Sequence, residues 1–210
     1  VKGTSSDGRL RGGASVFYSD YSDFQARVSQ DVGSFPVLNA AELEIKGIEL
    51  EGAAFIGEAT TLSAQIGWLD ADYKKFEDFR LDPSYPGFDP NVNHDHVPFS
   101  PDWTARVALH HNFSIANGSS LGVGGDLSYR GKTWLSVDNR EVLSQDAYTL
   151  AGLYAIWDSP EYVWQVRAGV RNLTDEEYKV EGQEFASVGN IQTAYYGWRR
   201  NWYVSLRYNF

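Results

Sequence analysis

The chain ends in the stretch Trp202-Tyr203-Val204-Ser205-Leu206-Arg207-Tyr208-Asn209-Phe210. Its even-numbered positions are all apolar or aromatic, and its odd-numbered positions are mostly polar. Such strict alternation predicts a β-strand with one apolar face and one polar face. Chain ends of soluble domains are usually loosely held, so an amphipathic strand that runs to the final aromatic residue is unusual there. The stretch therefore predicts the closing strand of a membrane barrel, with lipid on one face and water on the other.

The bulk composition agrees with a membrane barrel and excludes other classes. The 210 residues are 42% hydrophobic with a mean hydropathy of −0.40, and no apolar run approaches the ~20 residues of a membrane helix. Because alternating strands lower the mean hydropathy, the value does not exclude a β-barrel. The 13 Tyr, 7 Trp and 20 Gly suit strands with aromatic girdles. The net charge of −10 argues against nucleic acid as a partner, and the absence of Cys excludes disulfides and thiol chemistry.

Alternation of apolar and polar residues recurs along the chain and predicts about eight antiparallel strands. Connections after the first, third, fifth and seventh strands are long, and those after the second, fourth and sixth are short. Outer-membrane barrels show this asymmetry, with short periplasmic turns and long extracellular loops. The expected strands cover residues 9–28, 40–55, 60 onward, 103–110, 121–130, 148–156, 162–171 and 202–210.

The two faces of these strands differ in charge. The apolar face carries no Asp, Glu, Lys or Arg in seven strands, whereas charged residues make up 22% of the chain. A charge on a lipid face costs roughly 2–4 kcal/mol at the membrane midplane, so lipid explains this absence. The polar face is expected to line a water-filled lumen, and its charged residues are Arg11, Arg106, Asp126, Arg130, Arg167, Arg171 and Arg207.

Two strands need an additional assumption. In the second strand the apolar parity changes between Ile45 and Ile48, and a bulge at Gly47 would explain the change. In the sixth strand one parity lies against Thr149, Ala151, Leu153 and Ala155. We expect its lipid-facing set to be Tyr148, Leu150, Gly152, Tyr154 and Ile156.

Several stretches resemble the C-terminal part of TonB-dependent outer-membrane receptors. Val170 to Tyr178 resembles the penultimate-strand motif of that family, with Thr174 where Phe is common. Ala194 to Arg199 resembles the segment before its last strand, with Trp198 where Pro is usual. Further matches, which together with these cover nearly all of the chain, are Ile45 to Leu50, Phe17-Tyr18 with Asp20-Tyr21, and the terminal Phe210.

The resemblance implies both an architecture and a function. The family barrel has 22 strands and a plugged lumen, so residues 1–210 would be its C-terminal part, and Val1-Lys2-Gly3 would end a preceding strand. The plug domain and the TonB box would lie outside this chain. The implied function is energy-driven import of a scarce nutrient, such as a ferric siderophore, across the bacterial outer membrane. The implied partners are outer-membrane lipid, the plug domain, a TonB-type energising protein, the barrel-assembly machinery and a small-molecule ligand, with no cofactor and no nucleic acid.

Three groups of residues are candidates for function. Aromatic, His and Arg side chains of the long loops could bind a ligand: Tyr85, His94, His96, Trp134, Tyr195, Tyr196, Arg199 and Arg200. The lumen-facing charges could guide an anionic ligand or pair with the plug and with neighbouring strands. By the resemblance, Leu206, Tyr208 and Phe210 would be read by the assembly machinery through strand addition, although Phe210 would also suit an aromatic girdle.

Alternative interpretations concern metal binding, catalysis and fold. His94-Asp95-His96 could bind a metal, but no further His lies nearby, so a polar loop without metal is the favoured interpretation. No credible catalytic set is present, and the chain is not expected to be an enzyme. A self-contained eight-stranded outer-membrane barrel, structural or enzymatic, is the second interpretation, and it requires the first and eighth strands to pair. A soluble, sugar-binding β-sandwich is the third.

Overall fold

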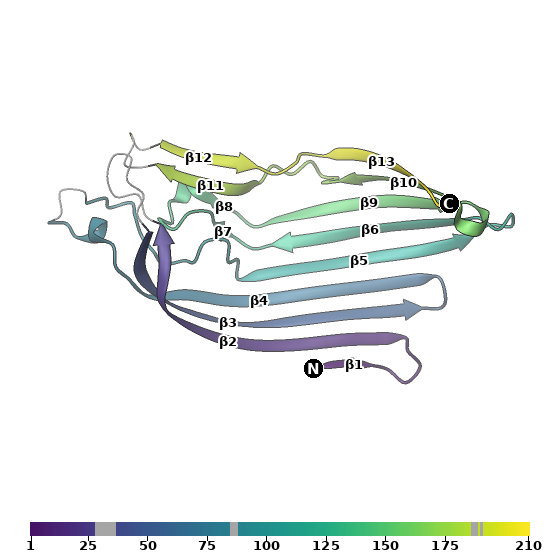
Figure 1. The fold of residues 1–210 in the computed structure, drawn as a ribbon, viewed down its shortest axis with the longest axis horizontal. Coiled ribbons are helices and arrows are strands. Elements are labelled where there is room, and N and C mark those ends of the chain that lie inside the picture. The colour runs from purple at the N-terminus through teal and green to yellow at the C-terminus, as the bar shows by residue number, and fades with distance from the viewer. Residues whose placement is uncertain (28–36, 85–87, 186–188, 190) are drawn as a thin grey trace.

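The computed structural model describes residues 1–27, 37–84, 88–185, 189 and 191–210. Its main element is a nine-stranded antiparallel sheet in the order β1-β2-β3-β4-β5-β6-β9-β10-β13 (Figure 1). The bounds of these strands are β1 Lys2–Thr4, β2 Leu10–Arg27, β3 Val37–Ile56, β4 Thr60–Phe76, β5 Trp103–Ser114, β6 Ser120–Arg130, β9 Tyr148–Asp158, β10 Trp164–Arg171 and β13 Asn201–Tyr208. The predicted all-β, antiparallel barrel-wall fold is confirmed.

The connections alternate between two ends of the sheet, as predicted. Short turns join β3 to β4, β5 to β6 and β9 to β10, and they gather at one end (Figure 1). The longer segments at the other end carry two small hairpins, formed by β7 Thr133–Trp134 with β8 Ser144–Gln145 and by β11 Lys179–Phe185 with β12 Ile191–Tyr196. The 3₁₀ turns are η1 Phe79–Leu81, η2 Glu141–Leu143 and η3 Pro160–Tyr162. No helix in the described part of the chain is long and apolar enough to cross a membrane.

The sheet is open. β1 pairs with β2 and β13 pairs with β10, and within the described ranges the two outermost strands do not pair with each other. The short β1 occupies the position expected for the end of a preceding strand. The second interpretation, a self-contained eight-stranded barrel, required closure between the first and last strands, and it is wrong for this sheet.

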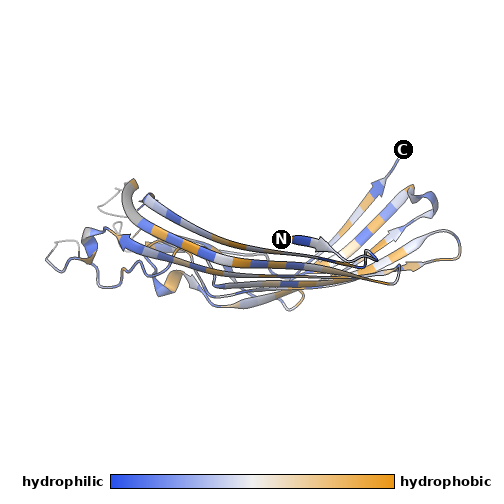
Figure 2. Ribbon diagram, turned by 90° about the horizontal axis from the view of Figure 1, so that it is seen from below, coloured by the Kyte–Doolittle hydropathy of each residue, from blue (hydrophilic) through white to orange (hydrophobic). Residues whose placement is uncertain are grey.

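The apolar face of the sheet is uncovered. Large apolar side chains such as Val16, Leu109 and Val204 are exposed, and the sheet is curved (Figure 2). Among the described residues, the buried apolar side chains are Ala26, Leu43, Val92, Leu135, Leu143 and Val170, and most of them lie at the long-loop end. A soluble β-sandwich would bury its apolar face against a second sheet. The sandwich interpretation is therefore wrong.

The bulge predicted at Gly47 is absent. Pairing of β3 with β2 and with β4 runs without a shift from Lys46 through Gly47 to Ile48. Alternate residues therefore stay on the same face of β3 throughout, and it is the type of residue on each face that changes at Gly47. From Gly47 toward the short-turn end, the face of β3 that continues the uncovered apolar face carries Ile48 and Leu50. From Gly47 toward the long-loop end, the same face carries Lys46 and Glu44. Leu43 on the opposite face is buried at the long-loop end.

This face inversion marks the level at which the strands leave the membrane. β2, β3 and β4 contain 18, 20 and 17 residues, although a tilted strand crosses a membrane in about 9–11. The excess of roughly eight residues corresponds to about 25 Å of strand length at 3.3 Å per residue. Above the inversion the outer face meets water, so it carries the ion pairs Lys46–Asp70 at 2.9 Å and Lys74–Glu44 at 3.1 Å.

The face assigned to the sixth predicted strand is also wrong. In β9, Tyr148 pairs with Arg130, Leu150 with Ser128 and Gly152 with Asp126, and these partners belong to the polar face. The set Tyr148, Leu150, Gly152, Tyr154 and Ile156 therefore lies on that face. The lipid-facing set is Thr149, Ala151, Leu153, Ala155 and Trp157. Both sets are apolar, so the sequence pattern of β9 alone could not distinguish them.

Candidate functional site

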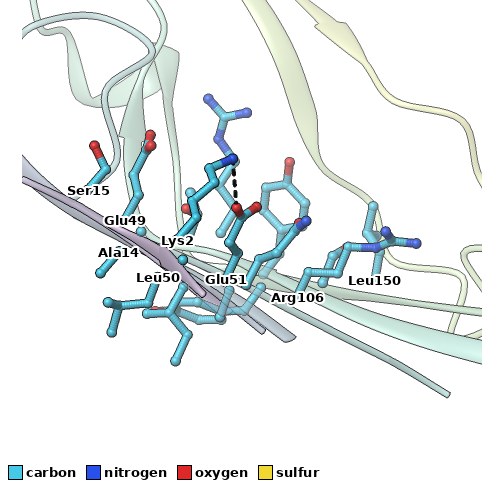
Figure 3. Close-up of a pocket in the computed structure, with 18 residues that line it drawn as sticks. Lys2, Ala14, Ser15, Glu49, Leu50, Glu51, Arg106 and Leu150 are labelled. Atoms are coloured by element: carbon cyan, nitrogen blue, oxygen red, sulfur yellow. Dashed lines mark ion pairs between the residues drawn. The ribbon is translucent and has the colours of Figure 1, made fainter. Parts of the chain in front are cut away.

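The polar face forms a hollow of about 750 Å³, in which Lys2 and Glu51 pair at 3.1 Å (Figure 3). β1 and β9, which lie far apart in the sheet order, both contribute to its lining. The polar face is therefore the concave side of the curved sheet. We call this concave surface the trough.

The seven charged residues predicted to face a lumen all share the polar parity of the trough, and among them Arg11 lies 5.0 Å above the ring of Phe55. Arg106 pairs with Asp126 at 3.5 Å, and Arg130 lines the hollow. Arg167 lies 4.8 Å above the ring of Tyr154. Further along the sheet, Arg171 lies over Tyr203, and Arg207 pairs in register with Gln165. These placements agree with the predicted side of the wall, and the proposed role in guiding a ligand stays a prediction.

Aromatic rings lie flat on the trough wall because their cross-strand partners are glycines. A Cβ atom at Gly124 would lie 2.5 Å from Cζ of Tyr154, and one at Gly169 would lie 2.6 Å from the hydroxyl of Tyr203. Any larger residue at these glycines would therefore displace the ring. The pairing resembles aromatic rescue, in which a ring covers the gap that a strand glycine leaves. The guanidinium of Arg167 in turn lies over both rings, 4.8 Å from the centre of Tyr154 and 5.9 Å from that of Tyr203.

The long segments at the other end form a second unit, which we call the cap: the described residues of 77–101, 131–146 and 179–196, without 85–87, 186–188 and 190. Its centre is the buried guanidinium of Arg80, which donates to both oxygens of Asp78 and of Asp138. The Arg80–Asp138 distances are 2.7 and 2.9 Å. Because these residues belong to different loops, the ion pair ties 77–101 to 131–146.

His94 completes this network. Its Nε2 lies 3.0 Å from Asp78 Oδ2 and its Nδ1 lies 2.7 Å from the carbonyl oxygen of Val137. Both partners are acceptors, so both hydrogen bonds form together only when each ring nitrogen carries a proton. Burial raises the pKa of Asp78, but the hydrogen bonds from His94 and Arg80 outweigh burial and hold that pKa below its usual range.

Arg140 connects the third segment of the cap. Its Nη2 donates to Asp89 at 2.5 Å, and its Nε lies 2.8 Å from Oε2 of Glu184 in β11. Lys179 at the start of β11 donates from Nζ to the carbonyl oxygens of Val142 and Ser144. The β11–β12 hairpin is thus fastened to segment 131–146, and segment 77–101 is held by the same arginine.

The cap and the end of β2 line an open cavity of about 340 Å³, in the range of small-molecule sites. Phe99, Ser136, Gln183 and Glu184 line it, and all three cap segments contribute. The hydroxyl of Ser136 is buried without a hydrogen-bond partner in the described structure. Burial raises the pKa of Glu184. This lining offers polar groups and an aromatic face to a small polar ligand.

The structure separates the predicted ligand residues. The His96 ring stacks on Trp134 at 5.2 Å in the cap, while Tyr195 and Tyr196 are exposed on β12. His94 is buried in the Arg80 network, so it supports the cap instead of lining an open site. Tyr85 lies outside the described residues. A ligand role for these residues stays a prediction.

Arg199 and Arg200 are engaged in a structural clamp. Arg199 forms a two-point pair with Asp175 at 3.1 and 3.2 Å, and the backbone N–H of Arg200 donates to the same carboxylate. These bonds hold the pKa of Asp175 below its usual range. Nearby, Asn172 adopts a φ of 51°, and its amide donates to the carbonyl oxygens of Glu176 and Trp198. The clamp joins the end of β10 to the start of β13.

The residues of the predicted assembly signal lie at the short-turn end. The Tyr208 ring lies 4.6 Å from Trp164 and 4.9 Å from Phe210, and Leu206 is exposed on the apolar face. This aromatic cluster suits a girdle at the membrane boundary. Recognition by an assembly machinery stays a prediction.

One group of side chains in the described residues has metal-ligand spacing: Asp78, His94 and Asp138. Arg80 already supplies cationic charge to both carboxylates, as described above. The cluster is therefore satisfied as an ion-pair network. The sequence pattern did not indicate Arg80, Asp138, Arg140 or Glu184 as functional residues. No local pattern shows that two residues 58 positions apart, such as Arg80 and Asp138, form an ion pair.

Comparison with known proteins connects this geometry to a family. Residues 2–173 match the family model described as TonB dependent receptor-like, beta-barrel. The ferric yersiniabactin uptake receptor FyuA from Yersinia pestis superposes over 100% of this chain with a TM-score of 0.77 and 17% identity. The chain covers 28% of that receptor.

Two further solved structures are similar. The siderophore receptor PiuA from Acinetobacter baumannii matches 98% of this chain with a TM-score of 0.68 and 18% identity. The ferripyoverdine receptor of the outer membrane of Pseudomonas aeruginosa matches 100% with a TM-score of 0.64 and 19% identity. The chain spans 26% of each of these proteins, and at these identities the similarity establishes the fold.

Proposed function

The chain belongs to the TonB-dependent receptor-like β-barrel family, and we propose that it forms the C-terminal part of the wall and cap of a receptor that imports a ferric siderophore or a similar scarce nutrient. Family membership places it in the outer membrane and among transport receptors, not enzymes. The long-loop end then faces outward and the short-turn end faces the periplasm.

The observation that carries the proposal is the combination of an open, lipid-facing sheet with a fastened outer cap. The ion pairs of Arg80 and Arg140 hold three loops around the cavity before any ligand arrives, which lowers the ordering cost of binding. Below the cap, the trough presents Arg106, Arg130 and Arg167. Arg106 pairs with Asp126, and Glu49 and Glu51 line the same hollow, so the arginines without such a partner in the described structure are the ones that would favour an anionic ligand or an acidic face of a plug domain.

The finer steps of the mechanism are also part of the proposal. A plug domain encoded outside these residues would fill the trough, and a TonB-type protein of the inner membrane would supply energy through that plug. Between β6 and β13, the rings of Tyr154 and Tyr203 with Arg167 above them offer such a domain an aromatic and cationic surface. The barrel-assembly machinery would recognise β13 through Leu206, Tyr208 and Phe210.

Growth and uptake assays test this proposal. A strain that lacks the gene is supplied in turn with single ferric siderophores as its only iron source, and ⁵⁵Fe accumulation is measured. We expect that one ferric siderophore does not supply iron to the deletion strain and that the full-length gene restores its uptake. An uncoupler should abolish accumulation while leaving surface binding. Normal growth on every iron source, with a defect only on a carbon source, would contradict the siderophore class while keeping the receptor role.

Cavity variants test where the ligand binds. Gln183→Trp places a large side chain in the cap cavity, and Val180→Trp places the same side chain on the exposed side of β11. We expect the first variant to weaken ligand binding to whole cells and the second to leave binding unchanged. Equal binding by both variants would locate the ligand outside the cap cavity.

A further inference from the structure

The lipid-facing side of β5, β6 and β9 carries an apolar groove of about 550 Å³. Val107, Leu109 and Leu127 line it, while the small residues Gly125 and Ala151 keep part of its floor at backbone level. These residues belong to the outer parity of their strands. The groove is therefore continuous with the surface that meets membrane lipid.

His111 lies at the periplasmic end of the groove and is polar on an otherwise apolar face. Its Nδ1 lies 2.6 Å from the hydroxyl oxygen of Thr60, its partner on β4. The Phe113 ring meets the imidazole edge to face at 4.3 Å. No protein group in the described residues forms a hydrogen bond with Nε2 of His111. When the Thr60 hydroxyl donates to Nδ1, Nε2 carries the ring proton and points to an outside acceptor.

At the boundary of the hydrocarbon such an N–H group bonds to water or to a lipid oxygen, and the apolar groove beside it favours a lipid whose acyl chain lies in that groove. His111 lies close to the end of β5 at Ser114, beside the turn on the periplasmic side. Phosphate and ester oxygens of the inner leaflet lie at this level. From His111 up to Val107 the groove extends roughly 13 Å, at 3.3 Å per residue.

We propose that this groove holds one phospholipid of the periplasmic leaflet. An acyl chain occupies the groove between Leu109 and Leu127, and a phosphate or ester oxygen of the same lipid accepts a hydrogen bond from Nε2 of His111. The site rests on the membrane placement of the wall and not on the transported nutrient. Its failure would leave the proposed transport function untouched.

Lipid titration of the full-length receptor tests the site. The purified receptor in mild detergent is titrated with dioleoyl phosphatidylethanolamine, and bound lipids are counted by native mass spectrometry. His111→Phe keeps a ring against Phe113 but removes the donor, and Ala151→Phe fills the groove. Val204→Phe adds the same ring to the lipid face of β13, away from the groove, and serves as the control.

We expect the wild type and Val204→Phe to retain one tightly bound phosphatidylethanolamine. His111→Phe should weaken its apparent affinity by about tenfold, which corresponds to about 1.4 kcal/mol. Ala151→Phe should lose the bound lipid. Equal binding by all four proteins, or retention of lipopolysaccharide in place of phosphatidylethanolamine, would overturn the proposal. If Ala151→Phe fails to assemble, the ring-preserving His111→Phe variant still decides the outcome.

Discussion

The wall and the cap are built from the same chain but satisfy their charges in opposite ways. In the wall, the lipid-facing positions avoid charge, and charged side chains such as Arg106 are exposed in the trough. In the cap, Arg80, Asp78 and Asp138 are almost completely buried and form ion pairs with one another. The wall is thus specified by which solvent each face meets, whereas the cap is specified by partners far apart in sequence.

The largest expected effect comes from breaking the central ion pair of the cap. Arg80→Leu leaves two buried carboxylates without their cation, which should cost about 3–5 kcal/mol. We expect cap peptide bonds of the full-length receptor to become sensitive to protease in isolated outer membranes, while wall strands stay protected. Lys132→Ala, which removes the exposed pair with Glu141, is the control and should leave the cap protected. Equal protection of both variants would show that the Arg80 network does not hold the cap.

A charge on the lipid face should have the next largest effect, and it should be confined to the wall. Leu109→Arg faces lipid near the middle of β5 and should cost about 2–4 kcal/mol, so the amount of assembled receptor falls. Ala108→Arg introduces the same side chain one residue away, on the trough face opposite Asp126, and should assemble normally. Quantifying folded receptor in outer-membrane fractions compares the two. Equal assembly would contradict the assigned faces.

These two regions also differ in how far the sequence predicts them. Strand alternation predicted the wall and its loop asymmetry because each side chain responds locally to lipid or water. It failed at Gly47, where the solvent changes along a continuous strand, and in β9, where both parities are apolar. The cap could not be predicted, since the pairing of Arg80 with Asp138 depends on how two loops fold over the sheet. The resemblance identified the motif at Asn172, but not its clamp.

Acidification should loosen the cap by a smaller amount. The lowered pKa of Asp78 means that its stabilising contribution is present above about 3.8 and is lost as the pH falls further. Glu184 has a raised pKa, so acidification toward 4.5 should first stabilise the cap slightly. Hydrogen exchange of cap peptides should show this rise and then a loss of about 1–3 kcal/mol below the usual Asp range. Asp78→Asn should lack that loss, and an unchanged acid response in this variant would contradict the assignment.

The smallest effect is expected at the clamp that joins the end of β10 to the start of β13. Asn172→Ala removes the side-chain hydrogen bonds to the carbonyl oxygens of Glu176 and Trp198. Alanine also tolerates the positive φ at this position less well than asparagine, so the variant should lose about 1–2 kcal/mol of unfolding free energy. Asn172→Gly loses the same bonds but relieves the backbone and should cost less. Thermal unfolding of the purified full-length receptor ranks the two. A glycine variant less stable than the alanine variant would contradict the backbone part of this account.

The central claim is that one continuous strand, β3, passes from lipid to water at Gly47 without changing parity. A full-length receptor without other cysteines is given one cysteine at a time, in place of Glu44, Lys46, Ile48, Glu49 or Leu50, and each cysteine is labelled with a fluorophore. Quenching of the fluorescence by brominated lipid is then measured. Quenching at positions 48 and 50 only, with labels at 44 and 46 accessible to a water-soluble quencher, is the predicted result. Lipid quenching at position 49, or at 45 in a further variant, would show that the strand does change parity and would contradict the account.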